Sequence, residues 1–266
     1  MKILITGANG NLAKIVAEKL YEYSVSFIQC SSMPKNGQVY FNLNSKLDEA
    51  IFNEITHILH FATSPTYEVT NTETHFLNLA KEKNIKIIYF GSTSSYLNDK
   101  TIYGHYKKQI EDKVLNLGGV VITCGLIYGK DFNGQISQAA KYLSFLPFTV
   151  VLKGSKAIYL TSTERIIHVL LEVINSANFV SGRHLILQTP AIDLNDLLFS
   201  LSRFKFLKLV VPLKFVGLAL SSKFVFGRYF HFDRVKSIYS DFHEDLFNNT
   251  IDSSVEIIKW REELLK

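Results

Sequence analysis

Cysteine is scarce in this sequence, with Cys30 and Cys124 the only two among 266 residues. Each follows an apolar, strand-like run, and no CxxC pair or zinc-ligand spacing is present, which excludes a disulfide framework and a zinc-stabilised module. The HExxH helix, the GK[ST] phosphate loop and the G-x-S-x-G nucleophile elbow are also missing. We therefore expect no metal site, two small buried cysteines, and structural or surface roles for histidines such as His57, His60 and His168.

A strong excess of one charge is absent as well. The chain has 29 basic and 24 acidic residues, for a net charge of +5. No run of Lys and Arg interleaved with aromatic residues marks a nucleic-acid surface. We expect no nucleic-acid partner, and the mild basic excess suits an anionic ligand.

Long hydrophobic runs are missing too. The most apolar stretch, residues 206–227, is interrupted by Lys208, Pro212, Lys214 and Lys223 and falls short of the roughly 20 residues that a membrane span needs. We expect a packed pair of helices there, with contact to a membrane interface as the alternative. The N-terminal apolar segment is too short for a signal peptide, which predicts a cytoplasmic protein.

What the sequence does contain is an alternation of buried strands and amphipathic helices. Apolar runs predict strands at residues 2–6, 25–29, 56–62, 85–92 and 118–125, and three-and-four spacing predicts helices at 11–23 and 74–84. This order predicts an α/β fold with a doubly wound, Rossmann-type parallel sheet. We assign residues 1–128 to a nucleotide-binding domain.

Residues 129–266 alternate less regularly, and we assign them mainly to a small α/β substrate-binding region, with some segments returning to the sheet. The patterns there predict strands at 156–161 and 183–188 and helices at 163–175 and 194–204.

The stretch "ITGANGNLA" follows the first predicted strand and opens the first helix. Gly7 permits a tight turn, Gly10 lets a phosphate approach the backbone, and Ala13 is small enough for close packing of helix and strand. This position favours a dinucleotide site; the alternative is a turn that binds nothing.

The end of the second strand lacks the acidic residue that would bind the adenosine ribose. It reads "FIQCSS", with Ser31 and Ser32 followed by Lys35. Serines and a lysine suit a 2′-phosphate slightly better than a free ribose, so we favour NADP over NAD and keep both open.

Tyr103 and Lys107 lie one helical turn apart, so both side chains project from one face. Upstream, four hydroxyl residues end the fifth strand: Ser92, Thr93, Ser94 and Ser95. Lowering the pKa of a tyrosine from about 10 to about 7 requires roughly 4 kcal/mol. The start of a helix supplies about 1 kcal/mol. The rest must come from Lys107 and a positively charged nicotinamide ring.

Two other tyrosines compete for this role. Tyr96 and Lys100 have the same spacing, but Asn98 and Asp99 between them favour a turn. Tyr106 has no lysine four residues later, and we expect it to stack or to lie at the surface.

Together these motifs resemble the extended short-chain dehydrogenase/reductase family, in its nucleotide-sugar epimerase/dehydratase branch. The resemblance rests on "TGANGNLA", "HILHFAT", "YFGSTSSY", "YGHYK", "CGLIYG" and "SSVEIIKW". It implies that Tyr103 is the acid/base, that Lys107 binds the nicotinamide ribose, and that Thr93, or else Ser94, holds the sugar oxygen. It also implies that NAD(P) contacts the following residues: Gly7, Asn9, Gly10, Asn11, Leu12, Asn42, Leu43, Phe61, Ala62 and Thr63.

The chain departs from this family pattern at several points. Thr123 and Cys124 stand where Arg and Pro are usual, and Tyr103 follows Thr93 after only ten residues. The dehydratases of the family carry Asp-Glu after the threonine, whereas Ser94 and Ser95 stand here, which disfavours dehydration.

The resemblance then implies reduction of a 4-keto nucleoside-diphosphate sugar in surface-polysaccharide biosynthesis. A 4-epimerase is the alternative, and a non-catalytic NAD(P)-binding sensor of the same fold is the second. The resemblance also implies a homodimer.

Overall fold

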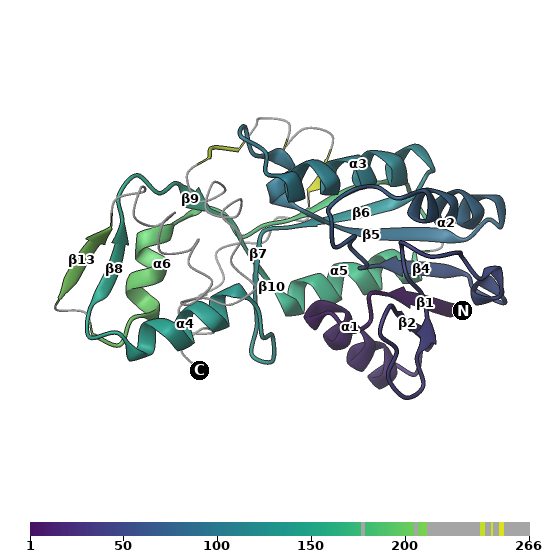
Figure 1. Ribbon diagram of the computed structural model, residues 1–266, viewed down its shortest axis with the longest axis horizontal. Helices are drawn as coiled ribbons and strands as arrows, with labels where there is room; N and C mark the ends of the chain where they lie inside the picture. Colours follow the sequence, from purple (N-terminus) through teal and green to yellow (C-terminus); the bar gives the residue numbers. More distant parts are fainter. Residues whose placement is uncertain (177–178, 205–206, 212–239, 243–245, 247–249, 253–266) are drawn as a thin grey trace.

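The computed structural model describes residues 1–176, 179–204, 207–211, 240–242, 246 and 250–252 (Figure 1). Most of the stretch 206–227 lies outside these residues, as does nearly all of the C-terminal tail. Residues 208–211 are described and form a strand, so the expectation of a helix is wrong there. In the described part of the chain, no helix combines the length and the hydropathy needed to cross a membrane.

The core of the molecule is one eight-stranded sheet in which every neighbouring pair is parallel. Its spatial order is β14-β11-β6-β5-β4-β1-β2-β3. The strands are β1 (Lys2–Thr6), β2 (Ser26–Ser31), β3 (Val39–Tyr40), β4 (His57–His60), β5 (Lys86–Ser92), β6 (Val120–Cys124), β11 (Gly182–Ile186) and β14 (Thr250–Asp252). The order reverses between β1 and β4, and such a switch point opens a ligand crevice at the carboxyl ends of the strands. The predicted doubly wound fold is confirmed.

Helices cover both faces of this sheet (Figure 1). On one face lie α1 (Asn11–Glu22) and α5 (Thr163–Asn175), and on the other lie α2 (Asn71–Glu82) and α3 (Ile102–Asn116). Alternate residues of a strand point to opposite faces. Accordingly Ile3 and Ile5 pack with the α1 and α5 side, whereas Leu4 packs with the α2 side. Burial on both faces explains why these strands read as continuous apolar runs.

The two cysteines are buried and free, as predicted, with exposed fractions of 0% for Cys30 and 2% for Cys124. Burial raises the pKa of both thiols to about 12, so neither is a reactive thiolate at neutral pH.

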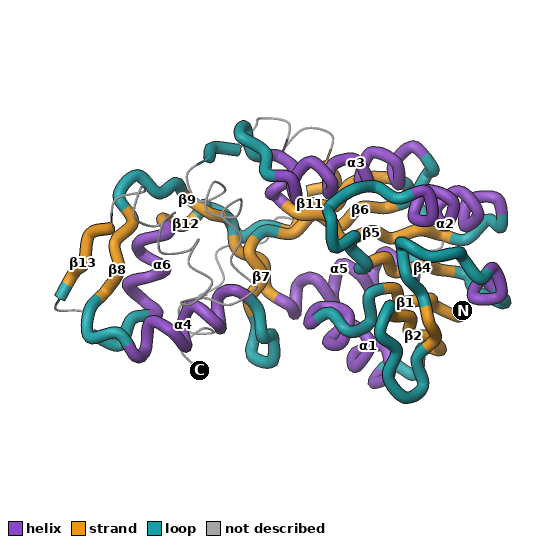
Figure 2. The backbone as a smooth tube through the Cα atoms, viewed as in Figure 1, coloured by secondary structure: helices purple, strands orange, loops and turns teal. Residues whose placement is uncertain are grey.

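A second body of structure follows β6, and Figure 2 shows it beyond the carboxyl edge of the sheet. It contains β7 (Leu126–Tyr128), α4 (Gln135–Phe145), β8 (Thr149–Leu152), β9 (Ala157–Ile158), β10 (Leu160–Ser162), β12 (Ile192–Asp193), α6 (Leu194–Leu201) and β13 (Lys208–Val211). All of these elements except β13 contribute to a small apolar cluster that includes Tyr128, Ile136 and Leu160. β13 pairs with β8. The chain returns to the large sheet through α5 and β11 between them. The boundary at residue 128 stays a prediction.

One predicted strand is split in two. Residues 156–161 form β9, which pairs with β12, and the start of β10, which pairs with β7. The break falls at Tyr159, whose carbonyl accepts a hydrogen bond from the backbone nitrogen of Leu126 (2.8 Å). An apolar run alone does not reveal that its two halves pair with strands of different sheets.

Candidate functional site

The glycine turn joins β1 to α1 at the switch point of the sheet. Gly7 has a φ of +66°, and a Cβ built there would lie 2.7 Å from the backbone nitrogen of Ala62, so only glycine fits between β1 and the end of β4. A Cβ on Gly10 would meet only the Gly7 carbonyl oxygen, at 3.2 Å. Gly10 also precedes α1, and within the described part of the chain no side chain caps this helix and no acidic residue lies in its first turn. The positive helix end is therefore left for an anion.

Asparagines connect this turn to its surroundings. The Asn9 side-chain nitrogen donates to Ser31 Oγ and to the Met33 carbonyl oxygen, both at 2.7 Å, which ties the turn to the end of β2. The Asn11 side-chain nitrogen donates to the Asn133 carbonyl oxygen, in the loop between β7 and α4. Leu12 is half-buried on the first turn of α1.

The predicted adenine and nicotinamide contacts lie on two loops beside the turn. Asn42 is half-buried, whereas the Leu43 side chain packs in the core. After β4, Ala62 lies against Gly7, and the Phe61 ring stacks on Phe90 with centroids 4.0 Å apart. Thr63 follows them and is half-buried.

The hydroxyl cluster leads directly into helix α3. Ser92 ends β5, and its side chain accepts hydrogen bonds from the Ser94 backbone nitrogen (3.3 Å) and the Ser94 hydroxyl (2.9 Å). Thr93 is buried, with 8% of its surface exposed. Helix α3 starts against this turn, because a Cβ on Gly104 would overlap the Ser94 carbonyl oxygen.

The structure brings Tyr103 and Lys107 together, as the sequence predicted. The Lys107 ammonium lies 5.8 Å from the centroid of the Tyr103 ring and 4.6 Å from that of Tyr89, and it donates to the Phe90 carbonyl oxygen (2.9 Å). Burial lowers the pKa of Lys107 to about 8, although the Glu73 carboxyl group acts in the opposite direction. Tyr103 is half-buried, and its ring meets Tyr67 edge-on at 5.3 Å.

The loop between the hydroxyl cluster and α3 is bound by a distant segment of the chain. Asn98 and Asp99 donate backbone hydrogen bonds to the Asp241 carbonyl oxygen and to Ser240 Oγ, both at 2.9 Å. Lys156 forms an ion pair with Asp241 at 2.9 Å. The short connection to Tyr103 is therefore hydrogen-bonded to residues 240–242, although Asn98 and Asp99 stay exposed.

The competing tyrosines are both buried. Residues 97–101 form no helix, as predicted, and the Tyr96 ring stacks under the Arg183 guanidinium at 4.4 Å. Of the two expectations for Tyr106, the surface position is wrong, because its side chain is 1% exposed and its hydroxyl donates to Glu73 Oε1 at 2.7 Å. The expected aromatic contact is present, since its ring lies 6.4 Å from that of Tyr67.

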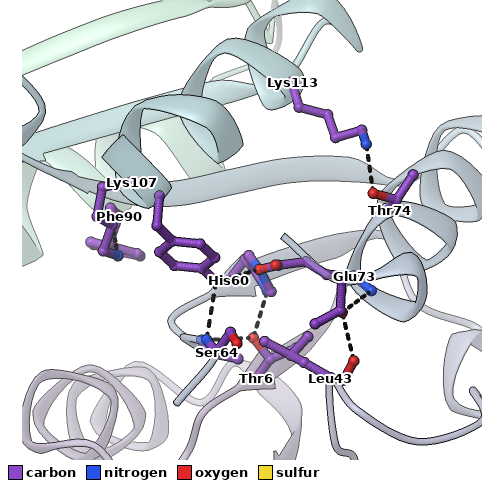
Figure 3. A network of polar contacts seen from close by, with 12 residues as sticks. Thr6, Leu43, His60, Ser64, Glu73, Thr74, Phe90, Lys107 and Lys113 are labelled. Atoms are coloured by element: carbon purple, nitrogen blue, oxygen red, sulfur yellow. Dashed lines mark hydrogen bonds and ion pairs between the residues drawn. The ribbon is translucent and has the colours of Figure 1, made fainter. Parts of the chain in front are cut away.

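Tyr106 belongs to a buried polar network (Figure 3). Glu73 Oε1 also lies 3.2 Å from His60 Nε2, and His60 Nδ1 lies 2.8 Å from Thr6 Oγ1. The Ser64 backbone nitrogen donates to the Tyr106 hydroxyl at 3.1 Å. The sequence analysis missed Glu73. The signal was its place on the buried face of α2, at three-and-four spacing from Phe76 and Leu77.

The described residues contain no group of three or more His, Cys, Asp or Glu side chains that could hold a metal ion.

Comparison with known proteins gives no sequence relative. No family model matches the chain, and no curated protein matches it at a significant level.

Solved structures do match. A dTDP-glucose 4,6-dehydratase from Bacillus anthracis, in complex with NAD, has a TM-score of 0.67 at 15% identity, over 80% of this chain and 84% of that one. A dTDP-4-dehydrorhamnose reductase from Clostridium acetobutylicum has a TM-score of 0.61 at 18% identity, over 80% and 83%. An L-threonine dehydrogenase from Phytophthora infestans has a TM-score of 0.65 at 13% identity, over 80% and 85%. At the level of the fold the resemblance is confirmed, because this chain shares its fold with these three enzymes.

Proposed function

We propose that the protein binds NAD(P) across the switch point between β1 and β4. The residues present fit such a ligand, because Gly7 and Gly10 leave the backbone open and α1 presents an uncapped positive end in the described structure. When bound, the cofactor supplies or accepts a hydride. Asn9, Asn11 and Leu12 would line the pyrophosphate, Asn42 and Leu43 the adenine, and Phe61, Ala62 and Thr63 the nicotinamide side.

The observation that carries the proposal is the position of the Lys107 ammonium, buried 5.8 Å from the centroid of the Tyr103 ring. With a pKa of about 8, Lys107 is cationic at neutral pH and stabilises a phenolate. Tyr103 would protonate the oxygen of a reduced carbonyl, and Thr93, or else Ser94, would hold that oxygen.

We infer a nucleoside-diphosphate sugar as substrate, supported by the mild basic charge and by the names of two of the three similar structures. The threonine dehydrogenase shows that the fold does not fix the substrate. Reduction of a 4-keto sugar is favoured over epimerisation and over dehydration, because Ser94 and Ser95 follow Thr93 and the connection to Tyr103 is short. We infer surface-polysaccharide biosynthesis as the setting, in the cytoplasm and as a homodimer.

NADPH is the favoured donor, with NADH the alternative. No acidic side chain stands at the end of β2, where Ser31 is hydrogen-bonded to Asn9 and to the Met33 backbone and where Ser32 and Lys35 are exposed. The dissociation constants of NADH and NADPH, measured by nicotinamide fluorescence, decide between them. A ratio near one would show that the residues after β2 do not recognise the 2′-phosphate.

Turnover is tested by adding NADPH or NADH and 4-keto nucleotide sugars to the purified protein and following nicotinamide absorbance. Tyr103→Phe should lower kcat by about 10²–10⁴-fold. Tyr96→Phe is the matched control, since it keeps the ring that stacks under Arg183 and should leave kcat unchanged. Full activity in Tyr103→Phe would refute the catalytic assignment, and cofactor binding without any turnover would favour the sensor.

A further inference from the structure

Glu73 is a buried acidic residue for which the proposed reaction has no use. Its side chain has no exposed surface, and Oε2 has no hydrogen-bond partner among the described residues. Burying a carboxyl group costs free energy that an apolar residue of similar volume would avoid. Packing of α2 on the sheet therefore does not require an acid here. The role of an acid at this position must therefore lie in the hydrogen bonds that the carboxyl group makes with His60 and Tyr106.

One set of contacts leads from Glu73 to the glycine turn. With its ring proton on Nε2, His60 donates to Glu73 Oε1 (3.2 Å) and accepts from the Thr6 hydroxyl at Nδ1 (2.8 Å). Thr6 Oγ1 in turn accepts from the Ala62 backbone nitrogen at 3.3 Å. Thr6 immediately precedes Gly7, and Ala62 is the residue against which Gly7 packs. This side of the network therefore fixes the spacing between the glycine turn and the end of β4.

A second set of contacts leads to the catalytic helix. The Tyr106 hydroxyl donates to Glu73 Oε1 and accepts from the Ser64 backbone nitrogen. Tyr106 is followed in α3 by Lys107, and the Tyr67 ring lies against both Tyr103 (5.3 Å) and Tyr106 (6.4 Å). The first turns of α3 are therefore anchored to the loop after β4 through one phenol.

A third contact leads to the predicted adenine loop. Thr70 caps α2 by accepting a hydrogen bond from the Glu73 backbone nitrogen at 3.0 Å. Its hydroxyl donates to the Leu43 carbonyl oxygen at 2.6 Å. Figure 3 shows Thr6, His60, Ser64 and Leu43 gathered around Glu73.

We propose that Glu73 is a positioning residue that, through His60 and Tyr106, holds the glycine turn, the end of β4 and helix α3 in the arrangement needed for cofactor binding and proton transfer. This inference rests on the proposed function. It assigns to the carboxyl group no contact with substrate. Its prediction is that breaking the network weakens cofactor binding and slows the chemical step beyond what lost stability explains.

The test uses three variants and two readouts, the dissociation constant of NADH or NADPH and the split between kcat and the sugar KM. Tyr106→Phe removes the donor to Glu73, and Glu73→Leu removes the acceptor. Both should raise the dissociation constant about tenfold and lower kcat about ten- to hundredfold, with little change in sugar KM. Glu73→Gln keeps an oxygen that can accept both hydrogen bonds and should stay within about threefold of the wild type.

Two controls separate positioning from general damage. Val114→Ala removes buried volume from the same helix without touching the network, so it lowers stability while the dissociation constant should not change. Glu111→Gln neutralises a buried carboxyl group on α3 that lies beside Lys108 and Arg183 and outside the Glu73 network, so it should leave cofactor affinity unchanged.

The outcomes separate the two claims. If the wild type binds neither NADH nor NADPH, the proposed function fails and this inference falls with it. If the wild type binds and turns over but Tyr106→Phe matches Val114→Ala in both readouts, the network is merely structural and this inference alone is overturned. Should Glu73→Leu not fold, Tyr106→Phe and Glu73→Gln still decide. The positioning role is supported if Glu73→Gln keeps the wild-type cofactor affinity and kcat while Tyr106→Phe loses both.

Discussion

Glu111 should make the protein less stable as the pH rises, and Glu111→Gln should remove that loss. The side chain is fully buried on α3, with Arg183 Nη1 at 3.6 Å and Lys108 Nζ at 3.8 Å. Neither carboxyl oxygen has a hydrogen-bond partner among the described residues. Burial raises the pKa of Glu111 from 4.5 to about 8, and the Arg183 charge only partly offsets this.

The sign and size of the effect follow from proton linkage. Because the pKa is raised in the folded state, the folded protein binds this proton more tightly than the unfolded chain does. The free energy of unfolding therefore falls as the pH rises from about 4.5 to about 8, and levels off above that. At 1.36 kcal/mol for each pKa unit, the full loss is about 5 kcal/mol, of which about 3 kcal/mol has accumulated by pH 7.

The assay is urea unfolding of the wild type and Glu111→Gln at several pH values between 4.5 and 9. Glutamine resembles the protonated acid, so the two proteins should be equally stable near pH 4.5. The variant should then become progressively more stable relative to the wild type up to about pH 8. Other titrating groups cancel in the difference. Parallel curves, or a variant that is less stable throughout, would show that the ionised carboxylate and Arg183 stabilise each other and would refute the reasoning.

The remaining predictions concern the cofactor site. Gly7→Ala should abolish NAD(P)H binding measured by fluorescence and lower Tm, because it adds a Cβ 2.7 Å from the Ala62 nitrogen. Gly37→Ala is the control, since Gly37 has a similar φ (+80°) but its Cβ would have no neighbour within 4 Å. Equal losses of binding and Tm in the two variants would show that the overlap with Ala62 is not the cause. The kcat/KM for keto-sugar reduction should fall above about pH 8, because Lys107 loses its proton there. Lys107→Arg should not show this fall, because the guanidinium group stays charged. If the fall is unchanged in Lys107→Arg, another group causes it.

Hydrophobic periodicity was enough to predict the six central strands of the sheet, but not the short edge strands β3 and β14. Strands β1 and β5 and helix α5 lie close to the bounds that their apolar patterns indicated, because each is buried in a way that its sequence must reflect. Helix α2 begins at Asn71, earlier than its apolar spacing suggested. Its first turn carries a capping threonine and a buried acid in place of apolar residues. The prediction of a single strand at residues 156–161 was wrong for a different reason. Which strands its two halves pair with depends on segments far away in the sequence.

The reactive pair could be predicted because its geometry is local. Tyr103 and Lys107 are one turn apart on a single helix, so their proximity needs only the helix itself. The Glu73 network could not be predicted in the same way. It joins side chains from β1, β4, α2 and α3, and no spacing along the chain encodes contacts between residues 54 or 33 positions apart.

The orientation of α3 follows from the same distinction. Its buried residues are Gly104, Tyr106, Lys107, Ile110, Glu111 and Val114, so half of its buried face bears a hydroxyl or a charge. An apolar stripe tolerates small shifts and rotations, whereas a hydrogen bond weakens steeply outside a narrow range of distance and angle. The hydrogen bonds of Tyr106 to Glu73 and of Lys107 to the Phe90 carbonyl oxygen thus fix the position of α3 at two points. A fully apolar buried face on α3 would make the protein more stable. The polar face instead defines the position of the Tyr103 phenol and the Lys107 ammonium.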